Sequence, residues 1–234
     1  MALLKQIQED FINIYQNDPA IKSRFELFFN YPGVWAVAWY RISNRIYRAR
    51  WRRTARFLMA INQFLTNIDI HPAATIGNRL FIDHGIGVVI GETAVIEDDV
   101  LIYQGVTLGG VSLTAGIKRH PTIKSRAVIG AGAKVLGDIV IGESAKVGSN
   151  SVVVKSVPPN CTAVGIPARV VGKGRSKDPL SHNKLPDIDK ELFEYLLKRV
   201  AILEHILMKE NSNILEQDLE LEQIYDSFIK AMKG

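Results

Sequence analysis

A six-residue periodicity runs through the middle of the chain, from Ile70 to Val153. Branched aliphatic residues occupy the repeating position in three sets: Ile70, Ile76, Ile82 and Val88; Ile90, Ile96, Ile102 and Leu108; and Ile123, Ile129, Val135, Ile141, Val147 and Val153. A period of six fits neither an α-helix nor a simple alternating strand, and it is typical of a parallel β-helix. Each hexad then forms one short strand and a turn, three hexads complete a triangular coil, and the aliphatic side chain points into the prism. We therefore expect a parallel β-helix over residues 68–173.

Helices are predicted on both sides of this domain, which makes the chain a mixed α and β protein. Residues 1–67 carry apolar residues at helical spacing, with a helix start at Asp18-Pro19 and a break at Pro32-Gly33. The polar segment 174–184 predicts a linker, and residues 185–234 predict a C-terminal helical extension.

The C-terminal extension contains two predicted helices. The first has apolar residues at alternating spacings of three and four, as in a short coiled coil: Phe193, Leu196, Val200, Leu203 and Leu207. The second runs from about Ile214 to Met232. The pattern fits two arrangements equally, packing of these helices on their own β-helix and association between subunits.

The composition is that of an ordinary globular protein and restricts the choice of partners. Hydrophobic residues make up 47% and charged residues 23% of the 234 residues. No apolar run reaches the ~18 residues that a membrane span needs. The first fifteen residues include Lys5, Glu9 and Asp10, which is unlike a secretory signal, and a single cysteine, Cys161, excludes an intrachain disulfide. We expect a cytoplasmic protein without a membrane partner.

The net charge of +5 is concentrated in one stretch. It contains seven arginines: Arg41, Arg45, Arg48, Arg50, Arg52, Arg53 and Arg56. We interpret them as the solvated face of a helix with the apolar stripe Ile42, Ile46, Ala49 and Phe57. No arrangement of base-stacking aromatic residues accompanies them, so no nucleic-acid partner is expected.

Charged and histidine residues gather where the periodicity is interrupted. They lie in four segments: Asp69-Ile70-His71-Pro72, Asp83-His84-Gly85, Thr107-Leu108-Gly109-Gly110 and Lys118-Arg119-His120-Pro121. The stretch 109–122 falls between the repeat positions Leu108 and Ile123, so it predicts a loop that leaves the coil. Long loops on rigid scaffolds commonly carry binding sites.

The pair Asp69 and His84 suggests acid–base chemistry. The two residues are 15 positions apart, slightly less than one coil, so they come from adjacent coils. A carboxylate that accepts from one imidazole nitrogen leaves the other nitrogen as a base. Such a pair alone could simply tie two coils together, but Asp83 and the Arg119-His120 loop favour a site.

A metal site is the main alternative use of the histidines. His84 and His120 are 36 positions apart, or two coils, and could face one another. A mononuclear zinc site needs three protein ligands. The sequence after His120 supplies no third histidine, and His71 looks more like a residue at the entry to the first coil, so we expect no metal. No motif for a covalent serine or cysteine mechanism is present, which favours direct group transfer.

The interrupted segments together resemble those of serine O-acetyltransferases. The resemblance covers residues 18–172 and rests on Asp69-Ile70-His71-Pro72-Ala73-Ala74, Asp83-His84-Gly85, Gly91-Glu92-Thr93-Ala94-Val95-Ile96, Thr107-Leu108-Gly109-Gly110, Arg119-His120-Pro121, Ile129-Gly130-Ala131-Gly132-Ala133-Lys134 and Gly165-Ile166-Pro167-Ala168-Arg169. The periodicity alone is shared with sugar and antibiotic acetyltransferases, whereas the combination of the Asp-Ile-His-Pro, Asp-His and Arg-His-Pro segments is more specific.

This resemblance implies a left-handed parallel β-helix that assembles as a trimer, with active sites between neighbouring prisms. It implies transfer of acetyl from acetyl-CoA to the hydroxyl of L-serine, which gives O-acetylserine for cysteine synthesis. By position, His84 is similar to the family's general base and Asp69 to its orienting aspartate. Asp18 and Asp83 match carboxylates near the substrate amino acid, and Arg119 and His120 match residues that receive its carboxylate. The residues similar to those along bound acetyl-CoA are Gly110, Ala131, Gly132, Lys146 and Ser149.

Two departures from the family affect the expected partners. The N-terminal helical region is shorter than in members where it joins two trimers, so a homotrimer is expected and a hexamer stays open. The chain ends in Gly234, whereas members that dock into O-acetylserine sulfhydrylase usually end in isoleucine, so that complex is not expected. Inhibition by cysteine stays open.

Two other functions compete with serine acetylation. A related acyltransferase could use the same histidine with a sugar or amine acceptor, and a non-catalytic β-helix could serve as an oligomeric scaffold. A zwitterionic amino acid needs partners of both signs, which Asp18, Asp83 and Arg119 supply. The scaffold leaves Asp69, Asp83, His84 and Arg119 unexplained.

Overall fold

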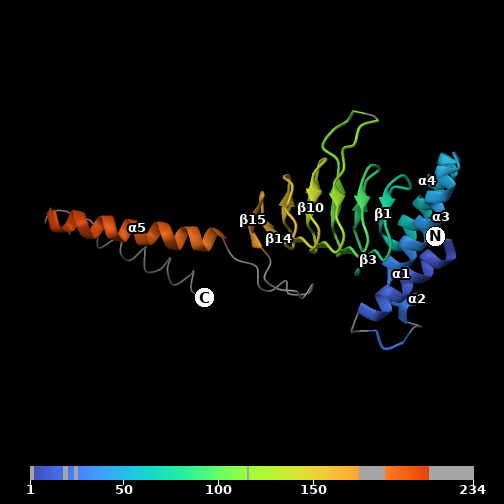
Figure 1. The fold of residues 1–234 in the computed structure, drawn as a ribbon, viewed down its shortest axis with the longest axis horizontal. Helices are drawn as coiled ribbons and strands as arrows, with labels where there is room; N and C mark the ends of the chain where they lie inside the picture. Colours follow the sequence, from blue (N-terminus) through green and yellow to red (C-terminus); the bar gives the residue numbers. More distant parts are fainter. Residues whose placement is uncertain (1–2, 18–20, 24–25, 115, 174–187, 211–234) are drawn as a thin grey trace. The chain divides into compact units, whose positions relative to one another are not determined.

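A computed structural model describes residues 3–17, 21–23, 26–114, 116–173 and 188–210 (Figure 1). The chain divides into two compact units, Met1–Leu185 and Pro186–Gly234. The first unit contains the N-terminal helices and the β-helix. The second contains α5 (Ile188–Glu210), which spans the predicted three–four pattern. The helix predicted over 214–232 and the linker predicted over 174–184 lie outside the described residues.

Residues 69–173 form the predicted parallel β-helix, which has three sheets. The first sheet contains β1 (Asp69–Ile70), β4 (Val89–Ile90), β7 (Thr107–Gly109), β10 (Lys134–Leu136) and β13 (Val152–Val153). The second contains β2 (Thr75–Ile76), β5 (Val95–Ile96), β8 (Thr122–Ile123) and β11 (Val140–Ile141). The third contains β3 (Phe81–Ile82), β6 (Leu101–Ile102), β9 (Val128–Ile129), β12 (Lys146–Val147), β14 (Cys161–Gly165) and β15 (Ala168–Lys173).

The aliphatic repeat residues fill the inside of the prism, as predicted. Every one of them is buried, and the most exposed, Ile76, reaches only 7%. The inward side chains therefore form one continuous apolar core that runs the length of the coils. Parallel backbone hydrogen bonds join each strand to its equivalent in the next coil.

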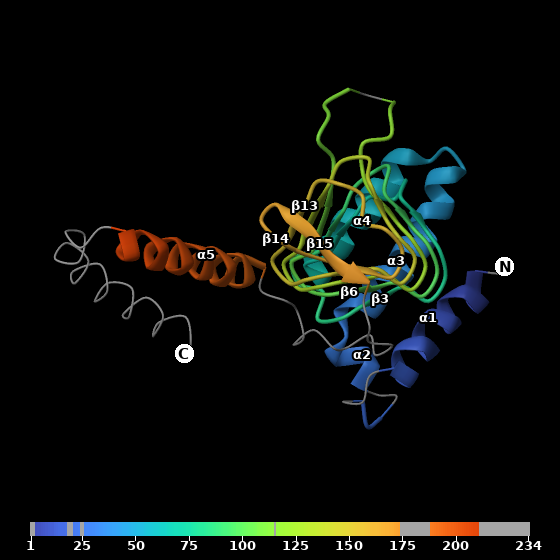
Figure 2. The ribbon, with the colours of Figure 1, turned by 60° about the vertical axis from the view of Figure 1, so that its left-hand side comes forward.

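The strand register shows two places where residues are inserted. Val89 of β4 pairs with Thr107 of β7, a coil of 18 positions. The preceding coil is longer, because Asp69 pairs with Val89, 20 positions on. Thr107 pairs with Lys134, 27 positions on. Two extra residues therefore enter the corner between β3 and β4, and nine enter the loop between β7 and β8, which projects from the prism in Figure 2.

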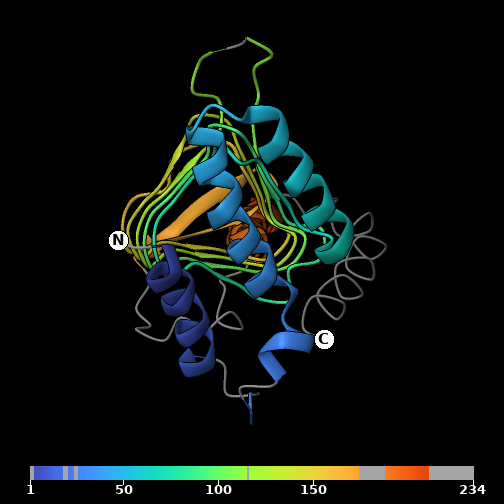
Figure 3. The same cartoon turned by 90° about the vertical axis from the view of Figure 1, so that its right-hand side faces the viewer.

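Two helices, α3 (Pro32–Arg48) and α4 (Arg52–Thr66), cross the N-terminal end of the prism, as Figure 3 shows. The helices α1 (Leu3–Asn17) and α2 (Glu26–Asn30) lie along one side of that end. Val37 and Tyr40 of α3 and Met59 of α4 join the first coil in the main core cluster. Gly33 lies against the coil so closely that a Cβ would come within 2.1 Å of the Ile82 carbonyl oxygen. The helices thus shield an end of the core that would otherwise face water.

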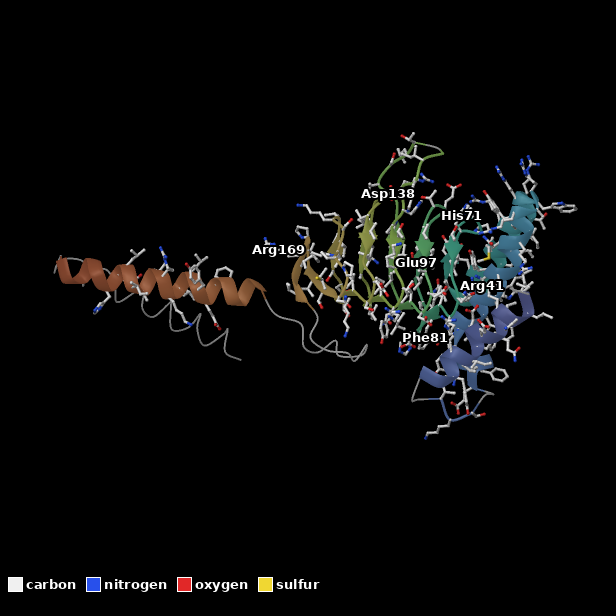
Figure 4. The ribbon with its side chains drawn as sticks, viewed as in Figure 1. Arg41, His71, Phe81, Glu97, Asp138 and Arg169 are labelled. Carbon is white, nitrogen blue, oxygen red and sulfur yellow. The ribbon has the colours of Figure 1, made fainter. Side chains whose placement is uncertain are left out.

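The predicted solvated arginine face is wrong at Arg41. Arg41 is 4% exposed, and its Nε lies 3.0 Å from Oδ2 of Asp10 on α1. Its guanidinium also donates to the carbonyl oxygens of Ile76 and Gly77. Figure 4 shows Arg41 where the helices meet the first coil. A helical pattern could not reveal this role, because the partners come from α1 and from a corner of the β-helix.

The predicted apolar stripe of the same region is also wrong. Ile42 is 42% and Phe57 66% exposed, and two helices, α3 and α4, replace the single arginine-rich helix. The buried face of α3 instead contains Val34, Val37 and Tyr40. The Tyr40 hydroxyl donates to the Ala74 carbonyl oxygen at 2.5 Å, so aromatic burial and a hydrogen bond together fix this face on the coil.

The other end of the prism finishes with an antiparallel pair, β14 and β15. Cys161 begins β14 and is 8% exposed. None of the helices that the structure describes is long and apolar enough to cross a membrane.

We predict that Arg41→Ala destabilises the protein much more than Arg126→Ala. The first change leaves Asp10 buried without its partner, and breaking a buried pair costs about 3–5 kcal/mol. Arg126 pairs with Glu143 at the exposed surface, where such pairs contribute about 0–1 kcal/mol. Chemical denaturation of both variants measures the difference, and equal losses would contradict the anchoring role of Arg41.

Candidate active site

The predicted site residues lie on two edges of the prism, one at each end of the strands in the first sheet. The corners that lead into this sheet form what we call the His84 edge, residues 83–88, 103–106, 130–133 and 148–151. The corners that leave it form the Arg119 edge, residues 71–74, 91–94, 110–121 and 137–139. A single chain therefore presents two separate groups of functional residues.

His84 projects from the corner that contains the two extra residues. Its backbone has φ +57°, and its side chain is 72% exposed. Nε2 lies 4.0 Å from Oδ2 of Asp83, a half-buried carboxylate. No other hydrogen bond or ion pair of the His84 ring occurs within the described part of the chain. The imidazole is therefore held out toward solvent with one carboxylate beside it.

Asp69 begins β1, next to this corner. Its backbone N–H donates to the Val88 carbonyl oxygen at 2.9 Å, which joins the strand to the end of the His84 corner. The described residues show no hydrogen bond between Asp69 and His84. The orienting role of Asp69 thus stays a prediction, supported by neighbouring positions in the fold. Asp18 lies outside the described residues.

Arg119 is fixed at the base of the projecting loop. Its Nη2 lies 3.2 Å from Oε2 of Glu92, and its Nη1 donates to the Ser112 carbonyl oxygen at 3.1 Å. Lys118 beside it lies 3.3 Å from Oδ1 of Asp138 on the next coil. These contacts place a guanidinium and an ammonium group at the Arg119 edge.

His120 is the most enclosed polar residue of this edge. It is 7% exposed, and its Nδ1 lies 3.2 Å from the backbone nitrogen and 2.8 Å from Oγ1 of Thr93. A Cβ on Gly91 would come within 2.0 Å of the His120 ring. Gly91 is thus required for the ring to lie flat against the neighbouring coil. Burial first, and then the charges of Arg119 and Lys118, lower the pKa of His120.

His71 lies on the same edge, and Figure 4 shows it on the side of the prism that carries Asp138. Its Nδ1 accepts from the Ala73 backbone N–H at 3.1 Å, and its Nε2 lies 3.1 Å from Nη1 of Arg56. Burial is the main cause that lowers the pKa of His71. Within the described ranges, no three His, Cys, Asp or Glu side chains are grouped closely enough to hold a metal ion.

The residues predicted for acetyl-CoA separate between the edges. Ala131, Gly132 and Ser149 belong to the His84 edge, and Lys146 belongs to β12 just before it. Gly110, by contrast, opens the loop at the Arg119 edge. Ala131, Gly132 and Ser149 thus lie on successive corners of one edge, and Gly110 lies on the opposite edge of the first sheet.

A row of glycines along the His84 edge extends the predicted set. Gly87, Gly105 and Gly132 all have positive φ and occupy equivalent corners of successive coils. A Cβ on Gly105 would come 3.4 Å from the Gly132 Cα, so larger residues would crowd this surface. Sequence reasoning identified Gly132 alone. The signal for the other two was their spacing of 18 positions, which is one regular coil. The spacing of 27 positions between Gly105 and Gly132 contains the inserted loop and is irregular.

Glu92 and Thr93 are the residues of the Arg119 edge whose contacts sequence reasoning missed. Both belong to a quoted segment, but their partners Arg119 and His120 are 27 positions away in the chain. Because the loop adds nine residues to this coil, regular spacing does not align the two corners. The register had to be known before the pairing became visible.

Comparison with known proteins identifies the class of protein and then the family. A family model described as bacterial transferase hexapeptide (six repeats) matches residues 120–155, which agrees with the coils and defines a hexapeptide-repeat transferase. The chain is 46% identical to serine acetyltransferase of Synechococcus elongatus over 203 residues, which cover 86% of this chain and 83% of that protein. It is 46% identical to serine acetyltransferase of Bacillus subtilis over 202 residues, which cover 85% of this chain and 92% of that protein. The chain belongs to the serine acetyltransferase family.

Solved structures agree with this membership. Soybean serine acetyltransferase complexed with serine has a TM-score of 0.69 and 44% identity, and the match covers 72% of this chain and 69% of that one. A serine acetyltransferase in complex with CoA has a TM-score of 0.68 and 40% identity, with coverage of 72% and 69%. The predicted left-handed β-helix and the predicted family are thus both confirmed.

We predict that His120 titrates below the ordinary histidine value of 6.5, because burial and two neighbouring cations oppose its protonation. Lys118→Met removes one cation and should raise the midpoint. Lys5→Met changes an exposed lysine of α1, which packs near β3, and should leave it in place. NMR titration of the imidazole measures all three, and a wild-type midpoint at or above 6.5 would contradict the electrostatic description.

Proposed function

We propose that this chain transfers the acetyl group of acetyl-CoA directly to the hydroxyl of L-serine, with His84 as the general base. The observation that carries the proposal is the division of charges between the two edges. The His84 edge offers a solvent-facing imidazole with a carboxylate beside it. The Arg119 edge offers cationic groups suited to a carboxylate. Serine needs both, because it carries an ammonium group, a carboxylate and a weakly nucleophilic hydroxyl.

The reaction assigned to these groups is a direct acyl transfer. An imidazole nitrogen of His84 accepts the hydroxyl proton as the serine oxygen attacks the thioester carbonyl carbon. The carbon–sulfur bond of the tetrahedral intermediate then breaks, and the departing CoA thiolate receives the proton from His84. The products are O-acetylserine and CoA, and His84 returns to its neutral form.

The charged groups around the reaction have separate tasks in this proposal. Asp83, with Asp18, attracts the ammonium group of serine, while Arg119 and His120 receive its carboxylate. Asp69 orients His84. The glycine row of the His84 edge, together with Lys146 and Ser149, borders the extended acetyl-CoA, because residues without side chains let a ligand approach the backbone.

The separation of the two edges supports a homotrimer as the active form. One chain cannot bring its own His84 and Arg119 edges together, because the first sheet lies between them. In the proposed homotrimer, the His84 edge of one prism lies beside the Arg119 edge of the next, which gives three identical sites. We also propose a cytoplasmic location, which fits the single, buried cysteine.

We predict that His84→Ala lowers turnover by ~10²–10⁴-fold, the usual contribution of general-base catalysis. The fold should survive, because the side chain is largely exposed. Thiol release from acetyl-CoA with L-serine as acceptor measures the rate, and His205→Ala in α5 is the matched control. Full activity in a well-folded His84→Ala protein would refute the assignment.

A second prediction tests whether the site is shared between chains. Arg119→Ala should raise the serine KM and leave the acetyl-CoA KM near wild type, because Arg119 receives the serine carboxylate. When this variant and His84→Ala are unfolded and reassembled together, random mixing should produce intact sites at about one quarter of the wild-type number. Each variant reassembled alone is the control. No recovery in mixed oligomers would place the whole site within one chain.

A further inference from the structure

The hydroxyl of Thr93 lies at the centre of a small hydrogen-bond network on the Arg119 edge. Its Oγ1 accepts from the backbone N–H of Arg119 at 3.0 Å and from the backbone N–H of His120 at 3.1 Å. A hydroxyl oxygen has two lone pairs, so both are occupied. The hydroxyl proton is then free to be donated, and the remaining atom within reach is Nδ1 of His120, at 2.8 Å.

The same ring nitrogen faces a second donor. The backbone N–H of Thr93, which can only donate, lies 3.2 Å from His120 Nδ1. A proton on Nδ1 would point at this N–H, which is also a donor. It would also need an acceptor on Thr93 Oγ1, whose two lone pairs are already occupied. Both contacts therefore require Nδ1 to be an acceptor without a proton. This reasoning fixes the tautomer from the network of partners.

An imidazole that lacks a proton on Nδ1 carries it on Nε2 when neutral. Nε2 has no hydrogen-bond partner among the residues that the structure describes. The ring lies between Gly91 and Gly110, and a Cβ on Gly110 would come 3.1 Å from Nε2. The one donor of the ring is thus reserved for a group that is not part of the described chain.

We propose that Thr93 is a positioning residue that holds His120 as a neutral imidazole with its proton on Nε2, so that His120 donates to the carboxylate of bound serine. This inference rests on the proposed function for its ligand, but the proton assignment stands on the protein alone. A ring that already has a proton on Nε2 cannot accept one there. The arrangement therefore makes His120 a hydrogen-bond donor and leaves the role of base to His84.

The charges around His120 favour the same state. Burial and then the charges of Arg119 and Lys118 oppose a positive charge on the ring, whereas Glu92 on the neighbouring corner favours it. His71 on the first coil is a further titratable group within electrostatic range, and Asp138 pairs with Lys118. The groups that lower the pKa of His120 prevail, so the neutral donor persists as the pH falls toward 6.5.

The first experiment reads the tautomer directly in the wild-type protein. In protein labelled with ¹⁵N-histidine, His120 should show a pyridine-like Nδ1 and a pyrrole-like Nε2 at neutral pH. His120→Gln identifies its signals among those of the five histidines. A proton on Nδ1, or rapid averaging between the two tautomers, would overturn the proposal without any variant of Thr93.

The second experiment compares Thr93→Val with Thr93→Ser. Valine keeps the shape and removes the hydroxyl, so His120 is no longer held as a donor to the serine carboxylate. The serine KM should then rise roughly ten-fold, which is the cost of losing a hydrogen bond to a charged group. The acetyl-CoA KM should stay near wild type, and the His120 titration midpoint should rise. Serine keeps the hydroxyl and should preserve the wild-type tautomer and serine KM.

These outcomes separate the inference from the proposed function. If the wild-type enzyme is active and the Thr93→Val variant behaves like Thr93→Ser, the role of Thr93 is refuted and serine acetylation stays intact. A wild type without serine acetylation, but with the proton on Nε2 of His120, would refute the ligand and preserve the proton assignment. If Thr93→Val fails to fold, the wild-type spectrum alone decides the tautomer.

Discussion

The parallel stacking of the coils is the constraint on which the rest of the structure depends. Each strand must pair with its equivalent in the coil before and the coil after, while its aliphatic side chain stays inside the prism. Residues beyond the regular 18 cannot enter a strand without moving the inward side chains out of the core. They must leave at a corner. Both insertions do so, and one carries His84 while the other carries Arg119 and His120.

The same rigid stack controls the chemistry at its surface. Because neighbouring coils are only one strand spacing apart, a side chain on one corner lies directly against the backbone of the next. Gly91 accommodates the His120 ring in this way. The backbone N–H and the hydroxyl of Thr93 both face Nδ1 of the ring, and the Thr93 hydroxyl oxygen accepts from the backbone N–H of His120. The tautomer that we propose for His120 thus depends on the neighbouring corner, whereas burial and the cations of its own loop lower its pKa.

The N-terminal helices solve a different problem, since an open prism would expose its apolar core to water. Apolar packing covers most of that end, but the buried pair Arg41 and Asp10 fixes how α1 and α3 meet the first coil. Burial raises the pKa of Asp10, and Arg41 counters this through a hydrogen bond and its charge. Such a pair contributes more to specific orientation than its net energy suggests, because either partner alone would be costly to bury.

The sequence by itself determined the β-helix, its inward residues and the family, because a six-residue period leaves few alternatives and the interrupted segments are specific. It also indicated that His84, Arg119 and His120 lie where coils are interrupted. Only the tertiary structure decided which residues meet. Arg41 is buried in an ion pair with a carboxylate from another helix, and Thr93 contacts His120, which is 27 positions away in the chain. These pairings depend on strand register and helix docking, which are set by contacts between distant segments and leave no local pattern in the sequence.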